Sequence, residues 1–312
     1  MLFISTRCSI YWPSGTNFCA EQPVRINTAT KSRKYIEIDF FTKKRYFVAK
    51  VTFFLYFCSM ISKNLIKLVK SLEQKKYRRR EQLFVAEGPK VVHDLMAISE
   101  PKRIIATESW YSQNNIEADV VVTEDELRKV SFLQHPQEVM ALFPLPGHDE
   151  MIPAGLDQTL SLALDDVQDP GNLGTIIRLA DWFGIGHIFC SMATADAFSP
   201  KVVQSTMGSI ARVTLHYTDL SEMFHQLDGK VPVYGTFLDG SNIYEQPGLA
   251  NGIIVMGNEG NGISPAIEAF VSKRLLIPSY PMGRPTAESL NVAVATAITC
   301  AEFRRRQSLS EE

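Results

Sequence analysis

Short, continuously apolar runs alternate with amphipathic stretches through the second half of the chain. The apolar runs include LSLAL at 160–164, HIFC at 187–190 and GIIVM at 252–256. Strands that are apolar on both faces and separated by helices are typical of a parallel sheet covered on both sides. Residues 158–312 therefore predict an α/β fold, with a mostly parallel sheet, helices on both faces and a final helix over roughly 289–306.

A smaller alternating α/β region precedes this sheet and spans residues 60–143. It begins with a surface helix that runs into a basic turn, and its further predicted elements are strands at 83–86, 103–106, 119–122 and 138–143 and helices at 91–97 and 124–130. Pro89 suits the first turn of a helix, and Thr123 with Glu126 forms a capping box. The stretch 144–157 begins with three prolines and two glycines in twelve residues, which predicts a linker.

The first 59 residues differ in composition from the rest. They hold 13 of the chain's 31 aromatic residues, and nine Lys or Arg against three Asp or Glu. They lack the order of a secretory signal, and the apolar run at 51–61 is about half of the ~20 residues that span a bilayer. Three interpretations stay open: sequence upstream of a translation start at Met60, which we favour, a poorly ordered extension, and a lipid-associated anchor.

Charge and cysteine content exclude few functions. The net charge of −2 gives no overall attraction to nucleic acid, so an RNA site has to use local clusters. The five cysteines form no CxxC pair and the six histidines form no ligand pattern beside them. We therefore expect a reducing cytoplasmic compartment, no bound metal and no membrane span.

The stretch DPGNLGTIIRLADWFG at 169–184 follows a strand that ends in two aspartates, which is where open α/β sheets bind ligands. It contains GxxG but not the dinucleotide fingerprint GxGxxG. We expect Asn172 as the helix N-cap and Arg178 on the polar face. Arg178 then either forms a surface pair with Asp181 or serves a ligand, for which Gly174 would clear space.

Two later stretches also run from a predicted strand through a loop into a predicted helix. IIVMGNEGNGISP at 253–265 runs from a buried strand into a loop that presents backbone groups around Glu259. LLIPSYPMGRPTAESLNVAVATAI at 275–298 runs from a strand through a proline-rich loop into the final helix, with Asn291 at its start. Small residues on that helix allow close packing against another helix, including one from a second subunit. Each stretch by itself is also compatible with an ordinary strand-to-helix turn.

In this order and at these separations, the three stretches resemble the three motifs of the SpoU (TrmH-like) RNA ribose methyltransferases. The resemblance covers about residues 60–306, and FVAEGPKVV at 84–92 is similar to the ribosomal-protein-like substrate-binding module of that family. It implies a SPOUT-type domain whose carboxyl-terminal portion forms a trefoil knot, an exception to the rule against threaded chains. It also implies S-adenosylmethionine as cofactor and a cytoplasmic homodimer.

The resemblance also implies roles for individual residues. The matched catalytic residues are Asn172, Arg178, Glu259 and Asn291, and the matched cofactor-binding residues are Gly257, Ile277, Ser289 and Leu290. The connection over 278–288 is longer than is usual in the family, which leaves Met282 or Gly283 as alternatives to Ile277. An arginine stays charged at physiological pH. Arg178 is therefore either deprotonated in a desolvated site, or it clamps a phosphate and favours loss of the hydroxyl proton; we prefer the second.

The implied function is methylation of a ribose 2′-hydroxyl, with ribosomal RNA as the expected substrate. A tRNA ribose methyltransferase and a non-catalytic RNA-binding protein stay open, whereas the missing fingerprint argues against an oxidoreductase. The densest basic cluster after Met60 is interrupted by Tyr77, and it is expected to contact RNA phosphates through Lys75, Lys76, Arg78, Arg79 and Arg80.

Overall fold

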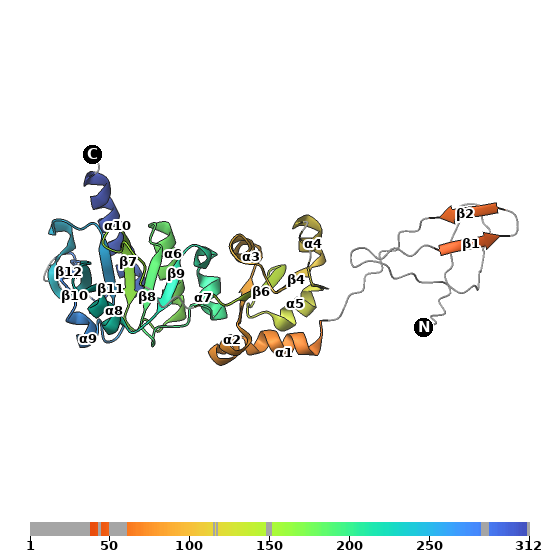
Figure 1. Ribbon diagram of the computed structural model, residues 1–312, viewed down its shortest axis with the longest axis horizontal. Helices are drawn as coiled ribbons and strands as arrows, with labels where there is room; N and C mark the ends of the chain where they lie inside the picture. The colour runs from red at the N-terminus through yellow and green to blue at the C-terminus, as the bar shows by residue number, and fades with distance from the viewer. Residues whose placement is uncertain are drawn as a thin grey trace. The chain divides into compact units, whose positions relative to one another are not determined.

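The chain forms two compact units, Met1–Cys58 and Ser59–Glu312. A computed structural model describes residues 38–42, 45–49, 61–114, 116, 118–147, 152–281 and 287–310. In the first unit, strands β1 (Ile38–Thr42) and β2 (Arg45–Ala49) pair antiparallel (Figure 1). The predicted start at Met60 and part of the predicted linker lie outside the described residues.

Residues 61–147 form a four-stranded part of the second unit. Its elements are α1 (Lys63–Ser71), α2 (Lys75–Glu81), β3 (Leu83–Glu87), α3 (Pro89–Met96), β4 (Arg103–Thr107), α4 (Glu108–Asn114), β5 (Val120–Val122), α5 (Glu124–Val130) and β6 (Val139–Pro144). The strand order is β3-β6-β4-β5. β6 pairs antiparallel with both neighbours, and β4 pairs parallel with β5.

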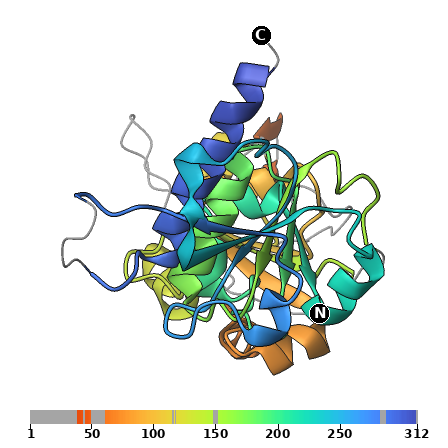
Figure 2. The ribbon, with the colours of Figure 1, turned by 90° about the vertical axis from the view of Figure 1, so that its left-hand side faces the viewer.

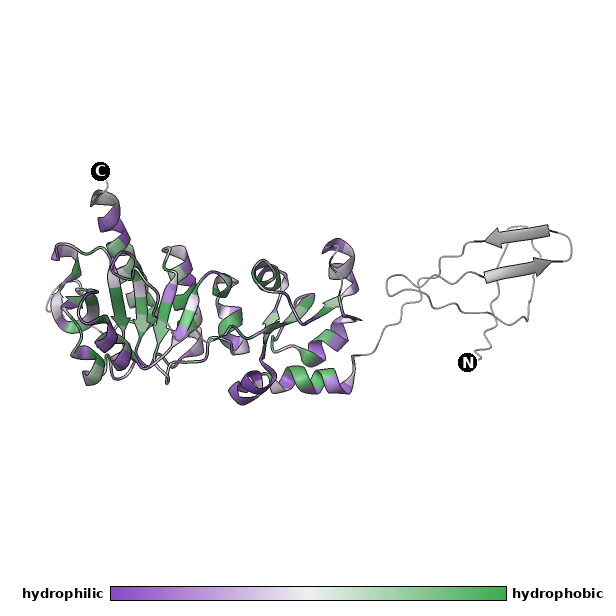
Figure 3. Ribbon diagram, viewed as in Figure 1, coloured by the Kyte–Doolittle hydropathy of each residue, from purple (hydrophilic) through white to green (hydrophobic). Residues whose placement is uncertain are grey.

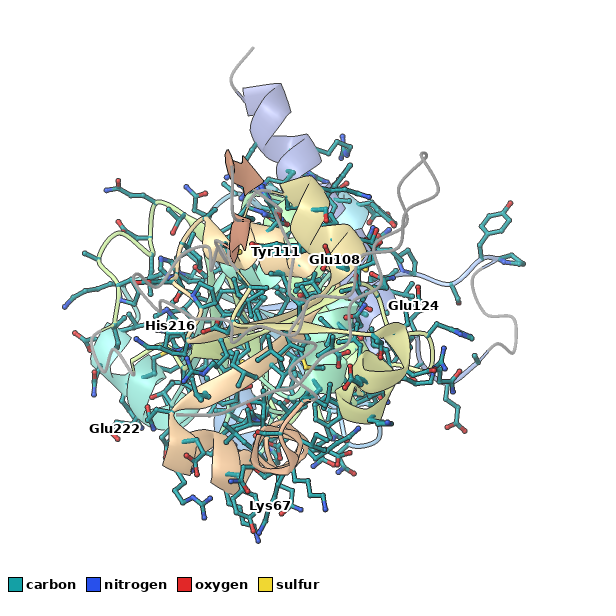
Figure 4. The ribbon with its side chains drawn as sticks, turned by 90° about the vertical axis from the view of Figure 1, so that its right-hand side faces the viewer. Lys67, Glu108, Tyr111, Glu124, His216 and Glu222 are labelled. Carbon is teal, nitrogen blue, oxygen red and sulfur yellow. The ribbon has the colours of Figure 1, made fainter. Side chains whose placement is uncertain are left out.

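Local sequence signals account for most of these elements. Pro89 occupies the first turn of α3, and the Thr123–Glu126 capping box is present at α5. Two helices differ from expectation: α4 was not predicted, and the predicted basic turn is the helix α2, which ends at Gln82 in the left-handed conformation. Figure 4 shows α4 with its exposed Tyr111.

Residues 152–310 form a six-stranded part. Its elements are β7 (Leu160–Leu164), α6 (Pro170–Trp182), β8 (His187–Cys190), α7 (Pro200–Ser205), η1 (Ser209–Ala211), β9 (Thr214–Tyr217), α8 (Leu220–Leu227), β10 (Val233–Asn242), η2 (Ile243–Glu245), β11 (Gly252–Met256), α9 (Pro265–Glu268), β12 (Lys273–Leu276) and α10 (Val292–Ser310). The strand order is β12-β10-β11-β7-β8-β9, and every pairing is parallel. The predicted parallel α/β fold is confirmed.

Helices cover both faces of this sheet. Leu162 and Ile254 point to the face that packs against α6, α7 and α10, whereas Ala163 and Val255 point to the face that packs against α8 and α9. Figure 2 shows α10 running along the first of these faces. Apolar colour gathers on the central strands in Figure 3, as expected for strands that are buried on both sides.

The four-stranded and six-stranded parts share one hydrophobic core. α7 of the six-stranded part packs against β3, and the Phe84 and Phe198 rings lie 5.0 Å apart between centroids. Val202 and Val203 of α7 belong to the same buried cluster as Val91 of α3. The two parts therefore contact each other directly through apolar side chains.

Gly174 allows α6 and α7 to pack closely. A Cβ at this position would lie 2.3 Å from Cβ of Ser205 and 3.1 Å from the carbonyl oxygen of Val202. The sequence interpretation, in which Gly174 clears space for a ligand beside Arg178, was wrong. The space beside this glycine is filled by α7.

We expect Gly174→Ala to destabilise the protein by about 1–3 kcal/mol, because the added methyl group overpacks the α6–α7 contact. The matched control is Gly186→Ala, since a Cβ at Gly186 meets nothing within 4 Å. Urea unfolding measured by circular dichroism compares the two variants. Equal stability of both would contradict the packing explanation.

Candidate active site

The candidate site lies where the strands of the six-stranded sheet end. Because β7, β11 and β12 are parallel, their carboxyl ends meet at one edge of the sheet. α6 begins six residues after β7, and the loop that contains Glu259 follows β11. This edge is the expected binding position in an open α/β sheet.

The start of α6 differs from the prediction in one respect. Asp169, not Asn172, is the N-cap: its Oδ1 accepts a hydrogen bond of 2.8 Å from the backbone N–H of Asn172. Pro170 occupies the first helical turn, where it needs no N–H partner. Since an aspartate caps the helix, the Asn172 side chain is available for contacts with other loops.

A chain of side-chain hydrogen bonds joins the three motifs. Nδ2 of Asn172 donates to Oε1 of Glu259 over 2.8 Å, and Oδ1 of Asn172 accepts from Nδ2 of Asn291 over 3.0 Å. Oδ1 of Asn291 in turn accepts from the backbone N–H groups of Ala293 and Val294, at the start of α10. Three residues separated by up to 119 positions therefore meet at one point.

The loop that carries Glu259 is a tight turn. Oδ1 of Asn258 accepts hydrogen bonds from the backbone N–H groups of Gly260 and Asn261, at 2.9 and 3.1 Å. A Cβ at Gly257 would lie 2.2 Å from the backbone carbon of Gly262. Only glycine fits there, so Gly257 allows the two ends of the turn to approach.

Two aspartates that follow β7 support this turn and were not singled out as site residues. Oδ2 of buried Asp165 accepts from the Ser264 N–H over 2.7 Å, and the carbonyl of Asp166 accepts from Nδ2 of Asn258 over 2.8 Å. Asp166 has φ of 59° and is held by Oγ of Ser191 over 2.6 Å. Their position as two adjacent aspartates at the end of a predicted strand was the sequence signal that could have identified them as site residues.

Arg178 lies on the exposed face of α6. Within the described part of the chain, no hydrogen bond or ion pair engages its guanidinium. Asp181 does not pair with it, because Nη2 of Arg212 binds Oδ2 of Asp181 over 2.8 Å and that hydrogen bond lowers the pKa of the carboxyl. The surface-pair interpretation was therefore wrong. Trp182, one turn further along α6, is 83% exposed.

The expected cofactor contacts lie in the loops at the same edge. Ile277 follows β12 and packs against the core while staying half-buried, and Leu290, just before Asn291, is 49% exposed. Ser289 is exposed. Met282 and Gly283 lie outside the described residues. Exposed apolar surface beside backbone polar groups can bind a flat aromatic ring.

Among the described residues, no group of three His, Cys, Asp or Glu side chains could hold a metal ion. Within the same ranges, no helix combines the length and apolar composition that crossing a bilayer requires.

Comparison with known proteins identifies the family. The SpoU rRNA Methylase family profile matches residues 159–301, and the MRM3-like substrate binding domain profile matches residues 63–141. The chain is 32% identical to the 23S rRNA (guanosine(2553)-2′-O)-methyltransferase RlmP of Bacillus subtilis, over 75% of this chain and 93% of that protein. The chain belongs to the SpoU rRNA methylase family.

Solved structures agree with this SpoU assignment. A TrmH-family protein from Porphyromonas gingivalis is 42% identical, with a TM-score of 0.71 over 79% of this chain and 99% of that one. An AdoMet-bound rRNA methyltransferase from Sinorhizobium meliloti is 28% identical, with a TM-score of 0.68 over 79% of this chain and 96% of that one.

The basic cluster of this SpoU-family chain is divided between two environments. Lys76, Arg79 and Arg80 of α2 are exposed, and Lys75 is half-buried with its Nζ 5.5 Å from the Tyr217 ring centroid. Arg78 is 2% exposed and forms an ion pair with Asp196, so it does not face the solvent. Arg78 is therefore not placed to contact an RNA phosphate, contrary to the expectation from the sequence.

We expect Asn172→Asp to loosen the Glu259 loop, because it removes the donor to Glu259 and sets two carboxylates side by side. A hydrogen bond to a charged group contributes about 1.4 kcal/mol or more, so its loss corresponds to about tenfold faster amide exchange. Hydrogen exchange measured by mass spectrometry over 257–264 and the start of α10 tests this. Asn261→Asp is the control, because it adds the same charge to the loop without removing a link between motifs. Equal exchange in both variants would contradict a connecting role for Asn172.

Proposed function

We propose that this chain transfers a methyl group from S-adenosylmethionine to a ribose 2′-hydroxyl of ribosomal RNA. The supporting observation is the hydrogen-bonded chain Glu259–Asn172–Asn291, which joins the three motifs on the helix that carries exposed Arg178. Family membership and the AdoMet-bound structure from Sinorhizobium meliloti support the cofactor.

The residues at the sheet edge fit S-adenosylmethionine. The cofactor supplies a methyl group on a positively charged sulfonium. Half-buried Ile277 and half-exposed Leu290 offer apolar surface to an adenine ring, and the family resemblance implies that backbone groups near Gly257 would help to hold it. The group requires no metal ligand from the protein.

Arg178 orients the ribose in this proposal. Its guanidinium is charged, exposed and without a partner among the described residues, so it is available to a phosphate or a hydroxyl. A guanidinium that binds the phosphate beside the target ribose would position the 2′-oxygen to take the methyl group; the demethylated cofactor would leave, and the hydroxyl proton would pass to solvent. Positioning alone supplies much of the rate of a transfer between two bound groups. Deprotonated Arg178 acting as a base is the alternative.

The connected loops hold the surroundings of Arg178 rigid. Asn172 and Asn291 fix the start of α6 against the start of α10, and Glu259 fixes the loop after β11. A shift of about 1 Å at a reacting group is enough to reduce turnover about 100-fold. In this proposal, these residues affect turnover by holding the loops around Arg178 in place.

We expect Arg178→Lys to retain most RNA affinity but to lose about 100-fold or more in turnover, because a lysine keeps the charge without the planar fork. Single-turnover methyl transfer from labelled S-adenosylmethionine measures the rate, and filter binding measures affinity. Arg128→Lys, on the exposed surface of α5, is the matched control. Near-normal turnover of the Arg178 variant would exclude both proposed roles.

Ribosomal RNA is the proposed substrate because RlmP is named for it and the MRM3-like profile covers the four-stranded part. Mapping of 2′-O-methylated positions in ribosomal and transfer RNA, with and without the gene, identifies the substrate. Loss of a tRNA site would favour the tRNA alternative. No change in either RNA would favour a non-catalytic RNA-binding protein.

Helix α2 is proposed as the phosphate-binding surface, through the exposed Lys76, Arg79 and Arg80. We expect Lys76→Ala with Arg79→Ala to weaken RNA binding and to reduce the slope of log K against log salt by about one per lost contact. Arg128→Ala with Lys129→Ala on α5 is the matched control, because it removes the same charge. Equal slopes for the two double variants would contradict this surface.

The trefoil knot and the homodimer are also proposals. The order β12-β10-β11-β7 is compatible with the knotted sheet that the family resemblance implies. On α10, Val294 is 49% exposed and Ala301 is exposed, and Trp182 of neighbouring α6 adds apolar surface. This surface supports self-association, which sedimentation of the purified chain tests. The cytoplasm stays the proposed compartment.

A further inference from the structure

A buried ion pair links α2 to the six-stranded part. Nη2 of Arg78 binds Oδ2 of Asp196 over 2.7 Å, and Nη1 donates to the carbonyls of Leu72 and Glu73 over 2.6 and 2.7 Å. Asp196 lies in the segment between β8 and α7, and its Oδ1 accepts from the Phe198 N–H. Arg78 thus connects the basic helix to a loop at the carboxyl edge of the large sheet.

A second set of contacts links α3 to the helix that carries Arg178. Nη1 of Arg212 binds Oδ2 of Asp94 on α3 over 3.3 Å, while its Nε and Nη2 bind Asp181 on α6 over 2.8–3.0 Å. Nζ of Lys90 also donates to the carbonyl of Met207 over 2.8 Å. Asp181 lies one turn beyond Arg178 on α6.

The hydrogen bonds of this second set favour the ionised forms of the Asp181 and Asp94 carboxyl groups. Hydrogen bonds from Arg212 lower the pKa of Asp181 despite partial burial. At Asp94, burial opposes ionisation, but hydrogen bonds from Lys90 and Arg212 lower its pKa below the ordinary value. Both carboxylates are therefore charged at neutral pH, and Arg212 bridges them.

The lack of a side chain at Gly208 allows Asp94 of α3 to approach the backbone closely. Gly208 precedes η1 with φ of 96°, and a Cβ at this position would lie 2.2 Å from Oδ2 of Asp94. The same interface also contains the apolar contact of Phe84 with Phe198, whose ring centroids lie 5.0 Å apart. The interface thus combines apolar packing with ionic contacts from the two helices α2 and α3, and contacts at two separate places oppose rotation of one part on the other.

Ionic contacts at this interface specify an orientation more than they add stability. Replacing a buried ion pair with apolar side chains is often neutral or stabilising, because burial of the charges costs about as much as their attraction supplies. Arg78 lies within the basic helix, while Lys76 and Arg79 face the solvent. The same helix therefore offers charges outward to a ligand and one charge inward to Asp196.

We propose that Arg78 and Arg212 are positioning residues that fix the four-stranded part on the six-stranded part in one orientation. RNA bound on α2 then presents its target ribose to Arg178 at a set distance. This inference rests on the proposed function, since it requires RNA on α2 and methyl transfer beside Arg178. Neither residue touches the reacting atoms.

The experiment compares the full chain with Asp196→Asn, Arg212→Gln and the double variant. Asn at 196 preserves the shape and the acceptor for Phe198 while removing the charge that faces Arg78. Asp125→Asn is the matched control, because it breaks an exposed ion pair with Arg128 inside the four-stranded part. Measurements are kcat and KM for RNA, S-adenosylmethionine affinity by calorimetry, and hydrogen exchange over α2, α3 and residues 194–212.

We expect the double variant to lose about tenfold or more in kcat, with KM for RNA and cofactor affinity changed less than about threefold. Exchange should rise at the interface but not in β7 or β11. A double variant with faster interface exchange and unchanged kcat would overturn the proposal, and so would a loss confined to KM. If the Asp196→Asn variant does not fold, the Arg212→Gln variant, which changes an exposed residue, is tested alone with the same measurements and the same criteria. An unaltered chain without methyl transfer would instead refute the proposed function.

Discussion

The side-chain amide of Asn172 is the contact on which the site depends. It donates to Glu259 and accepts from Asn291, so one residue links the loop after β11, the start of α6 and the start of α10. An amide can do this because it carries both a donor and an acceptor, whereas a carboxylate only accepts. The N-cap at Asp169 leaves that amide free for these two bonds.

α6 connects this contact to the rest of the molecule. Gly174 lets α7 pack against it, Arg212 binds its Asp181, and Nε of Arg304 on α10 donates to the carbonyl of Phe183 at its end. Arg178 is the charged residue of this helix that these contacts leave exposed. α6 thus holds the Arg178 guanidinium, which has no partner among the described residues, on a helix fixed at both ends.

Sequence reasoning was most successful where a signal is local. Thr123 with Glu126 and Pro89 marked helix starts correctly, because capping involves neighbours within a few residues. It failed where the partner is distant: Asp181 pairs with Arg212 and not with Arg178, and Arg78 turns inward to Asp196. Helical spacing could not show these partners, because they lie 31 and 118 positions away.

The sequence alone determined the parallel α/β sheet, the residue types of three loops and the resemblance that relates those loops to methyl transfer. These follow from periodicity and from motifs, which are properties of short stretches. The tertiary structure decided which side chains meet: that Asn172 joins Glu259 to Asn291, that Gly174 receives α7 instead of a ligand, and that Arg78 pairs with Asp196 instead of facing the solvent. The physical reason is that hydrogen bonds and close packing depend on distances in space, and only the folded sheet brings residues so far apart in sequence to one edge.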